Sequence, residues 1–116
     1  MIRSIRVSHI VLNTEALAKV LLENLQDIED RALLDKMFVK LAKKYSACNS
    51  RRKGGDLGWL EPQSNAPELV EATQAAPLGK VCGPVRTQYG YHIFMITEEA
   101  AMGDTGIDGI TAGTLR

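Results

Sequence analysis

Residues 5–12 read Ile5-Arg6-Val7-Ser8-His9-Ile10-Val11-Leu12. The alternation of Ile5, Val7, His9 and Val11 with Arg6, Ser8 and Ile10 has the two-residue period of a β-strand. Such a strand has at least one strongly apolar face. Asn13 and Thr14 follow, and their side-chain oxygens can accept hydrogen bonds from the free amides of a first helical turn. The sequence therefore predicts an opening strand that leads directly into a helix.

Two amphipathic helices are predicted after this strand, near 14–26 and from about 30 to 45, with the polar residues 27–30 between them. Their apolar residues recur every three to four positions: Leu17, Val20, Leu21 and Leu25 in the first helix, and Leu33, Leu34, Met37, Phe38 and Leu41 in the second. Lysines occupy the complementary face of the second helix. This spacing indicates that each helix packs one side on a sheet.

The remainder of the chain alternates loops with short strands. Residues 49–55 have the composition of a loop, residues 57–60 indicate a short strand, and Ala66-Pro67-Glu68 predicts a short third helix with proline in its first turn. Two further strands are expected near 81–86 and 91–98. We expect Pro84 at an edge or a bulge, because proline cannot donate to a strand ladder. The order predicts an α+β domain with an antiparallel-dominated sheet.

Composition limits the chain to one ordinary globular domain. It has 116 residues, of which 45% are hydrophobic and 24% charged, with a formal net charge of zero. We expect the domain to occupy residues 1–100 and the glycine- and threonine-rich residues 101–116 to form a flexible tail. No apolar run is long enough for a membrane span, and the first residues lack the apolar core of a secretory signal, so a cytoplasmic monomer is expected.

Seven cationic residues follow one another without an acid between them: Lys36, Lys40, Lys43, Lys44, Arg51, Arg52 and Lys53. Such a run could steer an anionic partner, including a nucleic acid. A solvated helix face followed by a basic loop is the favoured explanation of this run. Nucleic-acid binding is therefore possible on this sequence but is not predicted.

Few residues are candidates for chemistry. His9 and His92 are the only histidines, and one lies in the first predicted strand and the other in the last. Cys48 could be a nucleophile, a metal ligand or an inert thiol, since thiol reactivity depends on a lowered pKa. The glycine-rich residues 54–58 lack the Gly-Lys-Ser/Thr ending of a phosphate-binding loop, which leaves a tight turn into a strand. Cys48 and Cys82 lack metal-motif spacing.

Several fragments in order resemble the parvulin family of peptidyl-prolyl cis/trans isomerases over residues 5–98. The fragments are Ser8-His9-Ile10, Lys44-Tyr45-Ser46 with Cys48 following, Gly54-Gly55-Asp56-Leu57-Gly58-Trp59, Gly83-Pro84-Val85, and Tyr89-Gly90-Tyr91-His92-Ile93. The resemblance implies a parvulin-like, FKBP-like fold with four strands and three to four helices. It also implies isomerisation of X-Pro bonds in polypeptides by non-covalent stabilisation of the twisted amide, with no metal or cofactor.

The resemblance also assigns residues to the site. It implies a catalytic polar cluster of His9, Cys48, Thr87 and His92, and a substrate-binding set of Leu57, Leu60, Asn65, Leu69 and Tyr89. Cysteine or aspartate occupies the Cys48 position in the family, which implies an electrostatic or hydrogen-bonding role rather than a covalent one. A metal site made of His9, Cys48 and His92 is disfavoured, because no two of these residues are closely spaced in the sequence.

Three positions depart from the family pattern. Asn65 and Leu69 stand where methionine and phenylalanine are usual, and Leu60 replaces an aromatic residue, so slow or narrow isomerase activity is expected. The alternative is a catalytically weak proline-peptide-binding or chaperone module on the same fold. Residues 13–16 lack the basic cluster of phosphate-directed parvulins, which implies no strict demand for phosphate. Arg51, Arg52 and Lys53 could still favour acidic residues in the substrate.

Overall fold

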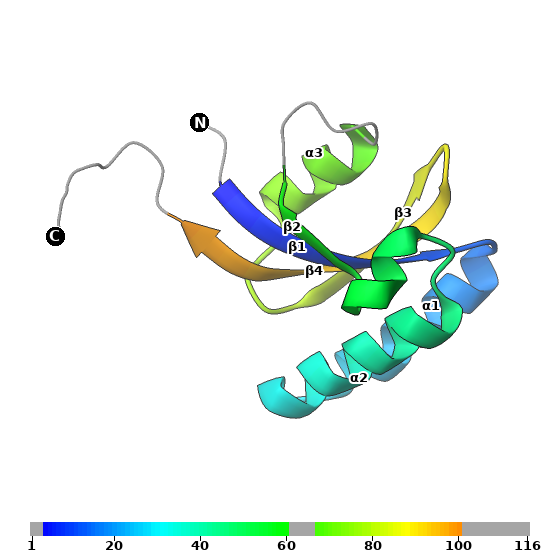
Figure 1. Cartoon of the computed structure of the whole chain (residues 1–116), viewed down its shortest axis with the longest axis horizontal. Helices are drawn as coiled ribbons and strands as arrows, with labels where there is room; N and C mark the ends of the chain where they lie inside the picture. The colour runs from blue at the N-terminus through cyan, green and yellow to red at the C-terminus, as the bar shows by residue number, and fades with distance from the viewer. Residues whose placement is uncertain (1–3, 61–66, 101–116) are drawn as a thin grey trace, which may run out of the picture.

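The computed structural model describes residues 4–60 and 67–100 (Figure 1). The strands are β1 (Ser4–Leu12), β2 (Asp56–Trp59), β3 (Val81–Thr87) and β4 (Gly90–Ala100), and the helices are α1 (Glu15–Gln26), α2 (Arg31–Tyr45) and α3 (Pro67–Ala75). The predicted order of strands and helices is confirmed. A short 3-10 helix, η1 (Asn49–Lys53), occupies most of the segment that was expected to be a loop.

The four strands form one sheet in the order β2-β1-β4-β3, and each neighbouring pair is antiparallel. The opening strand β1 is therefore central, and it lies beside the last strand along its whole length. Pro84 lies on the edge strand β3, where the register with β4 shifts between Cys82 and Val85. Its predicted position at an edge or bulge is confirmed.

Side-chain caps define where the first two helices begin. The Thr14 hydroxyl accepts a hydrogen bond from the Leu17 N–H, 3.2 Å, as the sequence predicted for this position. The Asp30 carboxylate accepts from the N–H groups of Ala32 and Leu33. These caps satisfy amides that have no partner within the helix, so both helices begin within one residue of the predicted positions.

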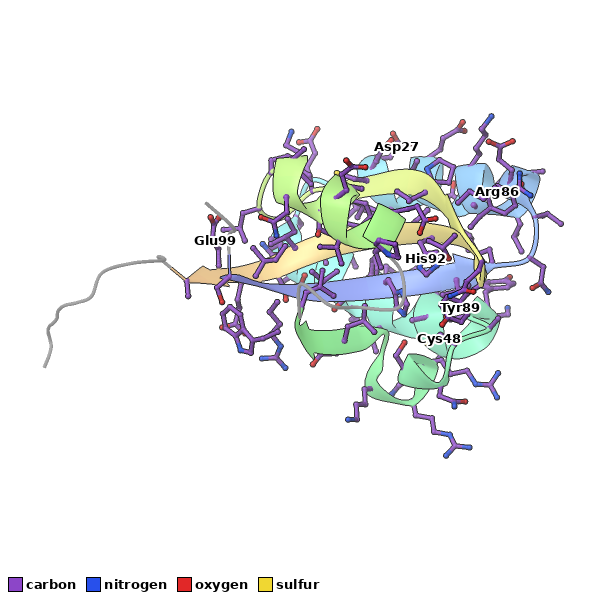
Figure 2. All side chains as sticks on the ribbon, turned by 90° about the horizontal axis from the view of Figure 1, so that it is seen from above. Asp27, Cys48, Arg86, Tyr89, His92 and Glu99 are labelled. Carbon is purple, nitrogen blue, oxygen red and sulfur yellow. The ribbon has the colours of Figure 1, made fainter. Side chains whose placement is uncertain are left out.

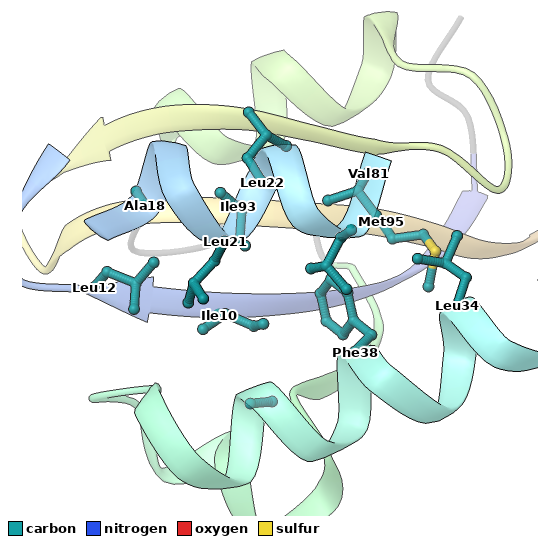
Figure 3. Close-up of a cluster of buried hydrophobic side chains, with 12 residues drawn as sticks. Ile10, Leu12, Ala18, Leu21, Leu22, Leu34, Phe38, Val81, Ile93 and Met95 are labelled. Carbon is teal, nitrogen blue, oxygen red and sulfur yellow. The ribbon is translucent and has the colours of Figure 1, made fainter. Parts of the chain in front are cut away.

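Helices cover both faces of the sheet, with α1 and α2 on one face and α3 on the other (Figure 1). The α1–α2 core contains Ile10, Leu12, Ile93 and Met95 from the sheet and Leu21, Leu22, Leu25, Leu34 and Phe38 from the helices (Figure 3). The α3 core contains Ile5, Val7, Leu69, Ala76, Phe94 and Ile96. Each core draws on alternate residues of β1 and β4, which is the period of two that the sequence showed.

The predicted buried faces of the helices need a correction. Leu17, Val20 and Leu33 are 37%, 53% and 48% exposed. The buried stripe of α1 consists instead of Ala18, Leu21, Leu22 and Leu25. This set has the complete i, i+3, i+4, i+7 spacing, so packing it on the sheet turns Leu17 and Val20 toward solvent.

Candidate functional site

The two histidines lie on neighbouring central strands and on the same face of the sheet. His9 follows Val7 by two residues on β1, and His92 precedes Phe94 by two residues on β4; Val7 and Phe94 both belong to the α3 core. The imidazole rings are 5.1 Å apart between centroids and inclined at 37°. Both histidines are buried. The two histidines of the sequence thus form one buried pair.

A continuous row of hydrogen bonds runs through this pair, and we call it the histidine row. The Ser50 hydroxyl is 3.1 Å from His9 Nε2, the two Nδ1 atoms are 3.0 Å apart, and His92 Nε2 is 2.7 Å from the Thr87 hydroxyl. The Tyr89 N–H also donates to Thr87 Oγ1, 3.1 Å. The row therefore extends from η1 across β1 and β4 to β3.

Proton counting restricts the row to two arrangements. A hydrogen bond between two Nδ1 atoms holds one proton, so one ring donates and the other accepts. If His9 donates, Ser50 donates to His9 Nε2 and His92 Nε2–H donates to Thr87. If His92 donates, the direction of every bond reverses. Both arrangements keep the rings neutral, so the row supplies polar groups without a buried charge.

Burial keeps the pair in this neutral form. Burial, and to a lesser degree the positive charge that His92 would carry, lower the pKa of His9 to about 4. Burial also lowers the pKa of His92, and the negative charge of Glu68 on α3 opposes that change. Neither imidazole is therefore expected to be protonated near neutral pH.

We predict that the free energy of unfolding of the domain decreases as the pH falls from 6.5 toward 4. The pKa of His9 is about 4 in the folded state and 6.5 in the unfolded state, so the unfolded chain binds the proton first. Stability is then complete above pH 6.5, and about 3 kcal/mol of the free energy of unfolding is lost as the pH falls toward 4. Urea unfolding between pH 7 and 4 measures this slope. His9→Leu should flatten it, and an equal slope in that variant would contradict the assignment.

The Gly54-Gly55 pair positions the end of the row that Ser50 forms. The Gly55 N–H donates to the Ser50 carbonyl and the His9 N–H donates to the Gly55 carbonyl, both at 2.9 Å. A Cβ on Gly55 would lie 2.4 Å from the His9 carbonyl oxygen, and one on Gly54 would lie 2.8 Å from a Val39 methyl. Glycine at both positions lets η1 approach β1 and α2 closely enough for Ser50 to contact His9.

Ser50 is the functional candidate that the sequence prediction missed. It belongs to a stretch with loop composition, and its contact with His9 spans 41 residues of sequence. Its only sequence signal is its place shortly before the two glycines. Of the predicted polar cluster, the structure joins His9, His92 and Thr87 in one row.

Cys48 does not join this row, although it is only two residues before Ser50 in the sequence. Its side chain is half-buried, its N–H donates to the Ser46 hydroxyl at 3.4 Å, and it directly precedes η1. Among the described interactions, no hydrogen bond links its thiol to either histidine. Figure 2 shows Cys48, Tyr89 and His92 at the end of the molecule where β3 turns into β4. Cys48 therefore belongs to the surroundings of the row.

The expected substrate-binding residues occupy different depths. Leu57 and Leu60 are half-buried and pack against the α3 core, whereas Leu69 is a full member of that core and only 2% exposed. Tyr89 is 53% exposed at the β3–β4 turn. Asn65 lies outside the described residues. Leu57, Leu60 and Leu69 thus form an apolar wall on the same face of the sheet as the histidine row, and Tyr89 lies outside this wall.

Two further expectations concern metal sites and membranes. Within residues 4–60 and 67–100, no three His, Cys, Asp or Glu side chains gather closely enough to hold a metal ion. In the same part of the chain, no helix combines the length and apolar character needed to cross a bilayer. The expected tail, residues 101–116, lies outside the described residues, so the division at residue 100 stays a prediction.

Known proteins are similar to this chain in both sequence and fold. The foldase protein PrsA of Geobacillus kaustophilus is 42% identical over 96 residues, which is 82% of this chain and 32% of the relative. The solved parvulin NmPin of Nitrosopumilus maritimus has a TM-score of 0.68 and 28% identity over 83% of this chain and 97% of its own. The chain thus spans about a third of the length of the curated relative and nearly all of the solved parvulin.

A third relative bears on the expected location. It comes from a study of PEB4 and the periplasmic protein Cj1289, two SurA-like chaperones of Campylobacter jejuni. The TM-score is 0.79 and the identity 29%, over 87% of this chain and 40% of that chain. The expected cytoplasmic location therefore receives no support from these relatives.

The family assignment rests on the match of a whole family model. The model described as rotamase, PPIC-type PPIASE domain, matches residues 8–98, which include all four side chains of the histidine row. The predicted parvulin resemblance and α+β fold are thereby confirmed. This chain belongs to the PPIC-type peptidyl-prolyl cis/trans isomerase family.

Proposed function

We propose that the domain catalyses cis/trans isomerisation of X-Pro bonds at the histidine row. The proline ring lies against Leu57, and the substrate chain crosses above His9 and His92. The observation that carries this proposal is a buried, neutral row of polar groups beside an apolar wall. Rotation about an X-Pro bond breaks no covalent bond, so the site needs only to bind the twisted amide better than the planar one.

Each part of the site contributes to that preference. The apolar wall holds the ring while the preceding residue rotates. The row contains hydroxyl and imidazole groups, and all its hydrogen bonds can reverse direction together. It can therefore adjust its polarity while the carbonyl oxygen of the X-Pro bond rotates. Cys48 contributes polarity at the edge of the row and forms no covalent bond to substrate. A short series of Ala-Pro peptides in an NMR exchange assay tests the activity. Acceleration well below that of efficient isomerases is expected because of Asn65, Leu69 and Leu60.

We predict that Leu57→Ala lowers kcat/KM by about tenfold, because truncation removes roughly 1.5 kcal/mol of apolar contact with the proline ring. The loss should appear with every Ala-Pro peptide in the series. Leu78→Ala is the matched control, since Leu78 is a leucine that is 50% exposed on the segment before β3. Equal rates for Leu57→Ala and the wild type would place the proline ring elsewhere.

A chaperone role is the second candidate, because the similar proteins include a foldase and SurA-like chaperones. In that case the domain binds proline-containing segments and accelerates isomerisation weakly or not at all. Chemical-shift mapping with a proline peptide separates the two. Shifts at the row together with exchange between cis and trans signals indicate catalysis, and shifts without exchange indicate binding alone.

The remaining expectations on location and partners are proposals of the same kind. The Campylobacter relatives favour a site of action outside the cytoplasm, and fractionation of cells that produce the native protein would decide between the two locations. We keep the expectation of a monomer, which sedimentation would test. Nucleic acid is not among the partners that the relatives support. Arg51, Arg52 and Lys53 remain candidates for attracting acidic substrate residues.

A further inference from the structure

Positive charge lies at the Ser50 end of the histidine row. Arg51, Arg52 and Lys53 are exposed and directly follow Ser50 in η1. The charge of Lys53 acts on Asp56, whose pKa it helps to lower together with the dominant hydrogen bond from Arg6. Arg51 and Arg52 form no ion pair among the described residues. These two arginines are therefore available to a substrate, and we call them the arginine pair.

Negative charge lies at the opposite end of the row. Glu68 is exposed in the first turn of α3, directly before the buried Leu69. Helix α3 packs against β3 and β4, and Figure 2 shows it close to His92. The Glu68 carboxylate is also the charge that opposes the burial-induced lowering of the His92 pKa. Glu68 thus acts on the His92 end of the row, whereas the arginine pair directly follows Ser50 at the other end.

We infer that the site selects substrates by the order of charges around proline, favouring an acidic residue before proline and a basic residue after it. This inference rests on the proposed function. In the arrangement that we infer, the proline ring lies against Leu57 and the chain that leaves the ring passes Glu68. The residue before proline is then on the side of the arginine pair. The arginine pair therefore attracts the acidic residue before proline, and Glu68 attracts the basic residue after it.

The dimensions of the site fit such a reading. Neighbouring strands are about 4.8 Å apart, so three spacings, roughly 14 Å, separate β2, which carries Leu57, from β3. An extended segment of about four residues that contains proline covers that length. Both ends are exposed, so each contributes only a modest surface interaction, and together they should favour the correct order by about fivefold at low salt.

Two peptides of identical composition test the inference: acetyl-Ala-Glu-Pro-Lys-amide and acetyl-Ala-Lys-Pro-Glu-amide, with acetyl-Ala-Ala-Pro-Ala-amide as the neutral reference. The charged peptides have the same net charge, so general attraction to the protein cancels in their ratio. NMR exchange gives kcat/KM for each. We expect the Glu-Pro-Lys peptide to be turned over about fivefold faster, and the ratio should fall toward one in roughly 1 M salt.

Charge-neutral variants assign the preference to its residues. Glu68→Gln, and separately Arg51→Gln with Arg52→Gln, should each bring the ratio closer to one. Glu23→Gln on α1, and Lys36→Gln with Lys40→Gln on α2, remove the same charges from exposed positions of helices that cover the other face of the sheet. These controls should keep the wild-type ratio.

The outcomes separate the two proposals. Turnover of the neutral peptide with a ratio near one or reversed, or a ratio that high salt leaves unchanged, would overturn the inference while the proposed function stands. A control variant that changes the ratio as much as Glu68→Gln would also overturn it. Absence of turnover for all three peptides would overturn the proposed function itself.

Discussion

His9→Ala should lower the free energy of unfolding by about 4 kcal/mol, because it empties a buried site and leaves two polar partners without their hydrogen bonds. His9 is only 4% exposed. Its Nδ1 is paired with His92 and its Nε2 with Ser50, so the variant orphans one ring nitrogen and one hydroxyl. A loss of this size is a large part of the stability of a domain of about 100 residues.

Two further measurements distinguish folding from chemistry. His9→Leu restores most of the lost volume but none of the hydrogen bonds, so it should recover only part of the stability. Val11→Ala, at a 3% exposed position two residues along the same strand, reports the cost of an apolar truncation alone. Thermal unfolding of His9→Ala that matches the wild type, with isomerase activity gone, would show that His9 acts in chemistry rather than in bracing the sheet.

The fold was largely predictable because its signals are local. The period of two in residues 5–12, the caps at Thr14 and Asp30, and proline in the first turn of α3 each act within a few residues. The buried face of α1 was mistaken because alanine at position 18 carries little hydrophobic signal, although it completes the stripe that packs on the sheet. Small residues in a core are recognised only when the neighbouring element is known.

The site was predictable only in part, because its contacts are distant in sequence. Alternation along β1 and β4 places His9 and His92 on one face, but their contact depends on the pairing of strands 83 residues apart. Thr87 is five residues from His92 and was available from the resemblance. Ser50 was missed because no local sequence pattern predicts that η1 packs against β1. Its placement depends on glycine at a point of close approach, and that dependence can be tested.

Gly55→Ala should cost about 4 kcal/mol in the free energy of unfolding, combining a strained backbone, a steric conflict and a weakened hydrogen bond. Gly55 has a φ of +89°, and an added Cβ would lie 2.4 Å from the His9 carbonyl oxygen. That oxygen belongs to the central strand and cannot move aside as a flexible side chain would. The turn must instead withdraw from β1, which moves Ser50 away from His9.

Gly58→Ala provides the control that separates strain from contact. Gly58 also has a positive φ, +73°, but an added Cβ there meets nothing within 4 Å. Its substitution should therefore cost only the backbone strain, about 1–2 kcal/mol. Urea unfolding of both variants measures the difference, and isomerase activity at urea concentrations below the unfolding transition reports the position of Ser50. Since η1 is held to β1 through the Gly55 carbonyl and the His9 N–H, equal losses in the two variants would mean that close approach at Gly55 does not position the histidine row.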